Sequence, residues 1–221
     1  MHMIFTGNPG TGKTTVARIV SRYLKAIGVL EGGQLVEVTR GDLVGQYVGH
    51  TAPLTQKAIQ SALGGVLFID EAYSLYRGKD DSFGLEAIDT LVKGMEDHRD
   101  DLVVILAGYS REMEEFLTAN SGLRSRFPNI IEFPDYTAGE LVEITKSIVA
   151  SKGYRLAPAC EIPLLAYYQR QQQEGDPRTN GNGRMARNVV ERAILNQSKR
   201  LVADPDASLE LLLPGDFDLD D

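Results

Sequence analysis

A glycine-rich segment close to the start of the chain has the residue types and spacing that bind a chain of phosphates. Residues 7–14 read GNPGTGKT and fit the pattern G-x-x-x-x-G-K-[ST]. The glycines let backbone N–H groups curl around phosphates, and the N-terminus of the helix that should follow adds a positive field. Lys13 can reach the β- and γ-phosphates, and the Thr14 hydroxyl can ligate Mg²⁺. We therefore expect the nucleotide at Asn8, Pro9, Gly10, Thr11, Gly12, Lys13, Thr14 and Thr15.

Two adjacent carboxylates, Asp70 and Glu71, follow an apolar run that has the length of a buried strand. Such a strand would carry Asp70 to the C-terminal edge of a parallel sheet, where open α/β sheets bind their ligands. Asp70 would then hold Mg²⁺, directly or through water, and Glu71 could polarise the water that attacks the γ-phosphate. The alternative, two solvated acids at a strand end, is disfavoured by the glycine-rich loop upstream.

A further apolar run, Leu102–Ala107, is followed by Gly108, Tyr109 and Ser110. In nucleoside triphosphatases that hydrolyse ATP with a glutamate, such a strand lies between the phosphate-loop strand and the acidic strand. A polar residue at its end touches the γ-phosphate or the attacking water. Tyr109 and Ser110 are the candidates for this role, and a simple packing role for Tyr109 stays equally open.

Three arginines could complete the site. Arg124 and Arg126 stand beside the last predicted strand, and an arginine directed at the γ-phosphate of a neighbouring subunit can raise the rate by several orders of magnitude. Arg184 opens the last predicted helix, and its guanidinium could fold back onto the phosphates of its own subunit. For Arg124 and Arg126, an ordinary solvated surface position is the alternative.

An aromatic and an aliphatic residue, Tyr47 and Val48, stand between glycines in the segment GQYVGH. In an exposed loop such a pair suggests a contact surface for another molecule. The alternative is that Tyr47 packs underneath its own loop.

These residues need a framework of alternating strands and helices to hold them. Apolar runs of strand length occur at residues 2–5, 35–38, 65–69, 102–107 and 130–133. Helical spacing of apolar residues occurs between them, at residues 13–27, 52–63 and 83–96. The alternation predicts the α/β class, with a parallel sheet covered by helices on both faces in three layers.

The pattern changes after Pro134, a residue that disfavours the continuation of a strand or a helix. Residues 138–151, 160–173 and 185–202 read as helices with no strand between them. Residues 174–183 read as a loop, since they are rich in turn formers. We expect a nucleotide-binding α/β domain over residues 1–135 and a small helical lid with a tail over residues 136–221.

Composition narrows the class of protein. The 221 residues carry a formal net charge of −8, whereas binding to a nucleic-acid backbone draws its affinity from basic residues. A single cysteine, Cys160, excludes an intrachain disulfide; it favours a buried filler role and a reducing, cytoplasmic setting. We find no run long and apolar enough to span a membrane and no secretory signal, so no membrane partner is expected.

Taken together, several segments resemble the AAA+ ATPases, and more narrowly the CbxX/CfxQ family, which includes stage V sporulation protein K and red-type Rubisco activase. The resemblance covers about residues 1–200 and goes well beyond the phosphate loop. The segments that carry it are GNPGTGKTTVAR (7–18), DLVGQYVGHTA (42–52), GGVLFIDEAYSLY (64–76), ILAGYSREM (105–113), GLRSRFPNIIEFPDY (122–136) and GNGR (181–184).

The resemblance implies a role for each matching residue. Lys13 and Thr14 match the Walker A positions, and Asp70 and Glu71 match the Walker B pair. The remaining matches are Arg126 as arginine finger with Arg124 as second choice, Arg184 as sensor 2, Tyr47 as a pore-loop aromatic and residues 76–81 as a second pore loop. Similar family members form hexameric rings that use ATP and Mg²⁺ to remodel a protein client.

The sequence departs from the family pattern in two respects. The sensor 1 position, usually Asn or a small hydroxyl residue, falls at Tyr109. The chain also starts at the first core strand, so the segment that normally closes over the adenine is expected to be missing. We interpret the chain as an ATP-hydrolysing module that threads or remodels a protein, with a nucleotide-gated scaffold as the first alternative and a nucleic-acid motor as a weaker one.

Overall fold

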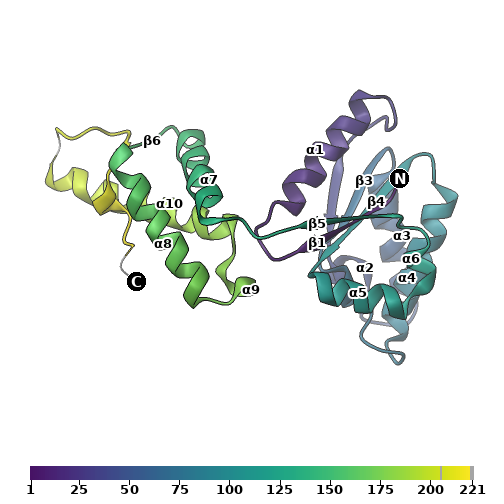
Figure 1. The fold of residues 1–221 in the computed structure, drawn as a ribbon. Helices are drawn as coiled ribbons and strands as arrows, with labels where there is room; N and C mark the ends of the chain where they lie inside the picture. The colour runs from purple at the N-terminus through teal and green to yellow at the C-terminus, as the bar shows by residue number, and fades with distance from the viewer. Residues whose placement is uncertain (205, 220–221) are drawn as a thin grey trace. The chain divides into compact units, whose positions relative to one another are not determined.

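The computed structural model describes residues 1–204 and 206–219, which form two compact units (Figure 1). The first unit comprises Met1–Gly7 and Gly12–Phe133. The second combines Asn8–Thr11 with the chain from Pro134 onward. The four residues Asn8–Thr11, at the tip of the phosphate loop, therefore belong to the second unit. The sequence did not suggest this division.

A five-stranded parallel sheet forms the centre of the first unit. Its strand order is β2-β3-β4-β1-β5, and every neighbouring pair is parallel. The carboxyl ends of all five strands consequently meet at one edge. The strands are β1 (Met3–Gly7), β2 (Leu35–Val38), β3 (Gly65–Ile69), β4 (Leu102–Gly108) and β5 (Asn129–Phe133).

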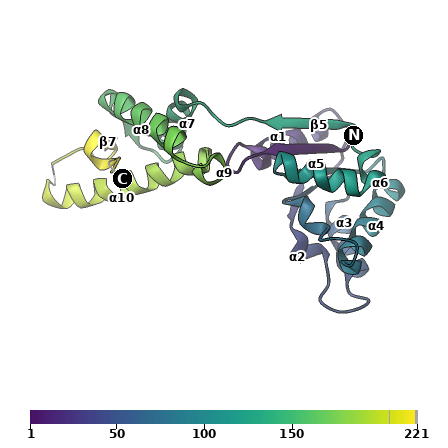
Figure 2. The same cartoon turned by 60° about the horizontal axis from the view of Figure 1, so that its bottom comes forward.

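Helices cover both faces of this sheet, which confirms the predicted three-layer α/β/α arrangement (Figures 1 and 2). Successive residues of the inner strands alternate between the two cores, so that Phe5 and Phe68 pack with α1 while Ile4 and Leu67 pack on the opposite face. The helices are α1 (Lys13–Ala26) on one face and α3 (Thr51–Ala62), α4 (Ser82–Asp97) and α5 (Ser110–Ala119) on the other. Short elements complete the unit: α2 (Arg40–Leu43), the 3₁₀ turn η1 (Ala72–Leu75) and α6 (Ser121–Arg124).

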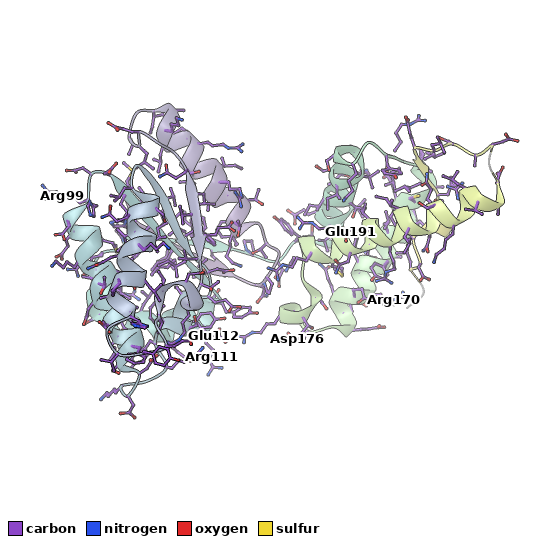
Figure 3. The ribbon with its side chains drawn as sticks, turned by 180° about the vertical axis from the view of Figure 1, so that it is seen from behind. Arg99, Arg111, Glu112, Arg170, Asp176 and Glu191 are labelled. Carbon is purple, nitrogen blue, oxygen red and sulfur yellow. The ribbon has the colours of Figure 1, made fainter. Side chains whose placement is uncertain are left out.

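The second unit is built mainly from three helices, α7 (Ala138–Ser151), α8 (Glu161–Glu174) and α10 (Gly183–Ala203). Its core includes Leu141, Tyr168 and Val190, each fully buried. Figure 3 shows Arg170 on α8 and Glu191 on α10. A capping box starts α7, since the Thr137 hydroxyl accepts from the Glu140 amide and the Glu140 carboxylate accepts from the Thr137 amide.

Two details of this unit correct the sequence analysis. A small parallel pair, β6 (Arg155–Leu156) with β7 (Leu211–Leu212), lies among helices where no strand was expected. The predicted loop at residues 174–183 contains a four-residue helix, α9 (Pro177–Asn180), which Asp176 caps by accepting from the Arg178 amide. Both elements are too short to produce a periodic pattern in the sequence.

Cys160 is buried in this second core, where burial raises its pKa to about 11. A thiol in this state is an unreactive, small apolar side chain, as expected from the sequence. Over the residues that the structure describes, no helix is both long and apolar enough to cross a membrane.

Candidate nucleotide site

The phosphate loop joins β1 to α1, as the sequence predicted. Gly12 precedes α1 with a φ of 95°, a left-handed conformation that suits glycine, and no side chain caps the helix. The first turn of α1 also contains no acidic residue. The first backbone N–H groups of this 14-residue helix thus lack an intrahelical partner and present a positive end suited to a phosphate.

Three side chains of the loop donate hydrogen bonds, two of them within the loop and one to Asp135. The Lys13 ammonium donates to the Gly7 carbonyl at 2.9 Å, and the Thr11 hydroxyl donates to the Asn8 carbonyl at 2.8 Å. The Asn8 amide donates to both carboxylate oxygens of Asp135, at 3.0 and 3.1 Å. The side chain of Asn8 thus anchors the loop to Asp135, which leaves the backbone of Asn8 as the part that could contact a nucleotide. Of the two threonines that follow Lys13, Thr14 is half-buried and Thr15 exposed.

The acidic pair stands at the carboxyl end of β3, and β4 lies between β3 and the phosphate-loop strand β1. The Asp70 carboxylate accepts from the Glu71 amide at 3.0 Å. Glu71 has φ 48° and ψ 47°, a left-handed conformation that costs energy for a residue with a side chain. Strain of this kind concentrates at functional positions, and here it sets the direction in which the exposed Glu71 side chain leaves the strand end.

Negative charge accumulates around these strand ends. Burial, followed by the charges of Glu71, Tyr109, Glu112 and Asp70, raises the pKa of Tyr73 to about 12. A cation would relieve the repulsion within this group. The described residues contain no cluster of three or more His, Cys, Asp or Glu that could cage a metal. The oxygens of Asp70 and Thr14 are the kind of donor that suits Mg²⁺, which is usually held by one or two protein oxygens together with water and substrate phosphates.

The end of β4 leads directly into α5. The Tyr109 ring stacks on Tyr73 with centroids 6.0 Å apart and an interplanar angle of 26°. Ser110 is exposed and begins α5, and Arg111 and Glu112 project from the same turn (Figure 3). Tyr109 has a packing partner in Tyr73, and its role toward the γ-phosphate remains a hypothesis beside that of Ser110.

The two arginines before β5 differ in their surroundings. Arg126 forms an ion pair with Glu96 of α4 and donates to the Gly122 carbonyl at 2.6 Å. Arg124, at the end of α6, is exposed. Arg184 is the second residue of α10 and is exposed.

Tyr47 lies in the loop between α2 and α3 with 66% of its surface exposed, and Val48 is 87% exposed. The ring contacts the edge of His50 at 5.5 Å. The alternative in which Tyr47 packs beneath its loop is therefore wrong. The loop borders a cavity of about 580 Å³ whose lining also includes Arg40, Arg77 and Phe83.

A partly buried ion pair fixes the base of this loop. Arg40 of α2 donates to both carboxylate oxygens of Asp81, at 2.6 and 3.0 Å, and to the Ser74 carbonyl at 2.8 Å. Asp81 also accepts from the Gly84 amide and so caps α4. The pair ties the segment that leads to Tyr47 to the segment at residues 76–81 that the sequence analysis assigned to a second pore loop.

We expect Asp81→Ala to be strongly destabilising. The substitution leaves the partly buried Arg40 guanidinium without its carboxylate partner, and it removes the cap of α4. The lost cap costs about 1 kcal/mol, and an unpaired buried charge costs up to about 3–5 kcal/mol. Its exposed neighbour gives a matched control, since Asp80→Ala should stay within about 0.5 kcal/mol of the parent. Urea denaturation measures both free energies of unfolding. Equal stabilities of the two variants would show that the pair contributes nothing.

The same pair predicts a dependence on pH. The Arg40 guanidinium holds the pKa of Asp81 below its ordinary value of 3.8. The stabilisation is therefore complete above the ordinary pKa and is lost as the pH falls through the lowered one. In Asp81→Asn, the free energy of unfolding should therefore no longer show the decrease at acid pH that protonation of Asp81 causes in the parent.

Two family models match this chain. Residues 3–135 match the family model described as ATPase family associated with various cellular activities (AAA), and residues 137–221 match the AAA lid domain. Stage V sporulation protein K of Bacillus subtilis is 51% identical over 202 residues, which are 91% of this chain and 63% of that protein. The chloroplastic ribulose bisphosphate carboxylase/oxygenase activase of Cyanidioschyzon merolae is 49% identical over 210 residues, 95% of this chain and 71% of that protein.

A solved structure is similar in fold. The Thermotoga maritima RuvB Holliday junction branch migration motor aligns with a TM-score of 0.65 at 23% identity, over 98% of this chain and 59% of its own. At that identity the likeness concerns the fold alone. The chain spans less than two thirds of the length of the sporulation protein it matches.

Proposed function

Because the chain belongs to the AAA family of ATPases, we propose that it uses ATP hydrolysis to move the loop that carries Tyr47 against a protein client. One observation supports the chemistry above all others. The parallel sheet brings the phosphate loop after β1 and the pair Asp70-Glu71 after β3 to the same edge, one strand apart. Phosphoryl transfer to water needs a phosphate cradle and an oriented nucleophile of this kind.

The residues divide the work by their chemistry. The α1 N-terminus and Lys13 bind the phosphates, and Glu71 orients the attacking water and accepts its proton. Thr14 and Asp70 hold Mg²⁺, which supplies neutralising charge to the phosphate oxygens. Arg184 contacts the phosphates of its own subunit, and Tyr109 or Ser110 contacts the γ-phosphate or the water.

The active form in this proposal is a homo-oligomeric ring, taken to be a hexamer, in which Arg126 of one subunit completes the site of the next. The ion pair with Glu96 holds Arg126 in the single chain. Subunit contact would replace Glu96 with the phosphates of the neighbouring subunit. A ring of this kind would work in a reducing cytoplasm, where its lone buried Cys160 needs no partner.

The client is proposed to be a protein. One relative at 49% identity carries the name of an activase of ribulose bisphosphate carboxylase/oxygenase, which is itself a protein. The net charge of −8 disfavours a nucleic-acid backbone as the client. Exposed Tyr47 and Val48 suit contact with an extended polypeptide, because they offer apolar surface without sequence-specific polar groups.

Tyr47→Ala separates a motor from a scaffold that ATP merely assembles. Since Tyr47 is exposed, its truncation should leave the melting temperature and basal ATPase close to those of the parent, unlike a core aromatic, whose truncation costs about 3–5 kcal/mol. We expect loss of client-stimulated ATPase and of client remodelling. Candidate clients are added to the purified protein, and ATP turnover and client unfolding are followed together.

A matched control is Tyr23→Ala, because Tyr23 of α1 is 61% exposed and lies outside the loop. This variant should remodel the client normally. Normal remodelling by Tyr47→Ala would show that threading through this loop is the wrong mechanism.

A further inference from the structure

Two residues other than glycine have a positive φ among those described, Glu71 and Asn182. Glu71 belongs to the acidic pair, whereas no role for Asn182 was predicted from the sequence. Asn182 has φ 46° and ψ −117°, a combination that favours glycine, and its neighbours on both sides are glycines. An asparagine in this strained conformation must be held there by other interactions, and its side chain is the obvious source of them.

The Asn182 side chain is buried, with 4% of the residue exposed, and all its described bonds lie in the second unit. Its amide nitrogen donates to the Pro9 carbonyl at 3.3 Å and to the Asp135 carboxylate at 2.9 Å. Its amide oxygen accepts from the Tyr136 amide at 2.9 Å. The amide oxygen and the amide nitrogen of Asn182 together link Asp135 and Tyr136, which follow β5, to Pro9 of the phosphate loop.

Two more donors act on the same part of the loop. The Gly183 amide donates to the Gly10 carbonyl at 2.8 Å, and the Tyr136 hydroxyl donates to the Thr11 carbonyl at 2.9 Å. The approach is close, because a Cβ on Gly10 would lie 2.0 Å from the Gly181 carbonyl oxygen. Three consecutive carbonyls, of Pro9, Gly10 and Thr11, therefore each accept one hydrogen bond from this unit.

Peptide geometry gives these bonds a consequence for ligand binding. In a planar trans peptide the C=O and N–H groups point in opposite directions, and no described peptide bond is cis. Donors that hold the three carbonyls on one side direct the N–H groups of Gly10, Thr11 and Gly12 to the other side. Successive N–H groups with a common direction form a nest for an anion.

We propose that Asn182 and Tyr136 are positioning residues that organise the backbone of the phosphate loop and thereby raise its affinity for the phosphates of a nucleotide. The proposal rests on the proposed function of this loop in ATP binding. It assigns to Asn182 a role through the loop, with no contact to the nucleotide. Asp135 supports it by accepting from both Asn8 and Asn182 through one carboxylate oxygen.

Asn182→Gly is the decisive variant, because glycine accepts this backbone conformation without strain while removing the side chain. We expect the melting temperature without nucleotide to equal or exceed that of the parent. The affinity for ADP, measured by titration calorimetry, should fall about 5–30-fold, the range for one or two lost hydrogen bonds. In steady-state ATPase assays KM should rise with kcat nearly unchanged, since the loss affects binding before the reaction.

Two comparison variants keep the result interpretable. Tyr136→Phe removes only the hydroxyl that bonds to the Thr11 carbonyl, and we expect ADP affinity to fall about 2–10-fold. Asn180→Gly places the same substitution two residues earlier, where the amide donates to the Gln171 carbonyl, and should bind ADP like the parent.

Each other outcome overturns the proposal. Parental ADP affinity in Asn182→Gly and Tyr136→Phe would contradict the inference alone, provided that the parent binds ADP. An equal loss in Asn180→Gly, or a loss that follows a lowered melting temperature, would make Asn182 merely structural. A parent chain that binds no ADP would contradict the proposed function itself and the inference with it.

Discussion

Glu71→Gln is expected to bind ATP as the parent does and to hydrolyse it at least about 100-fold more slowly. The amide cannot accept a proton from the attacking water, whereas the substitution leaves unchanged Lys13, Thr14 and Asp70, which are proposed to hold the phosphates and the metal. Glutamine tolerates the left-handed backbone of Glu71 no worse than glutamate does, so the strand end should keep its shape. Single-turnover hydrolysis and ATP binding are measured on the same preparation.

Glu112→Gln is the control for the local charge. Glu71 and Glu112 both raise the pKa of Tyr73, so each substitution removes one negative charge from the same neighbourhood. Only the loss of Glu71 should abolish turnover. If both variants lose activity equally, charge accounts for the effect, and if Glu71→Gln turns over ATP normally, Glu71 has no role in the reaction.

Arg126→Ala should reduce hydrolysis by about a thousandfold or more in the assembled ring, while the nucleotide affinity of the single chain stays almost intact. The reason is that Arg126 is proposed to act on the site of the neighbouring subunit. Mixing this variant with Lys13→Ala should restore part of the activity, because some interfaces then combine an intact pocket with an intact arginine. The readout is the ATPase rate at several mixing ratios, in rings shown to exchange subunits.

Two further substitutions separate this role from a structural one. Glu96→Gln breaks the ion pair of Arg126 but leaves the guanidinium in place, so hydrolysis should persist. If Glu96→Gln is as inactive as Arg126→Ala, the pair matters for folding rather than catalysis. If Arg124→Ala is inactive while Arg126→Ala is not, Arg124 is the finger. No rescue at any mixing ratio would count against a shared site.

The fold could be predicted from sequence where its pattern is local. Phe5 and Ile4 are neighbours in β1 that enter opposite cores, and the alternation of apolar runs with amphipathic stretches was sufficient to identify the class. The pair β6 and β7 could not be predicted, because Arg155 and Leu211 are each part of a two-residue strand and meet only in the tertiary structure.

The positions of the candidate site residues at the ends of β1 and β3 were also predictable. Glycine, lysine and threonine at fixed spacing predict a phosphate loop, and two carboxylates at the end of an apolar strand predict a site for a metal and the attacking water. The hydrogen bonds around Asn182 and Asp135 leave no such signature, since they depend on which carbonyls the folded chain brings within reach. The only hint was an asparagine between two glycines in GNGR. The contact of Arg126 with Glu96 was missed for the same reason.

The bond from Asn182 to the Pro9 carbonyl joins residues 173 positions apart, and this separation sets an order of events during synthesis on a ribosome. At about 5–20 residues per second, Pro9 is synthesised about 9–35 s before Asn182. The sheet from β1 to β5 can collapse in that interval, because its partners all precede Pro134. A nascent chain can thus complete its sheet before the hydrogen bonds from Asn182 are available to organise the phosphate loop.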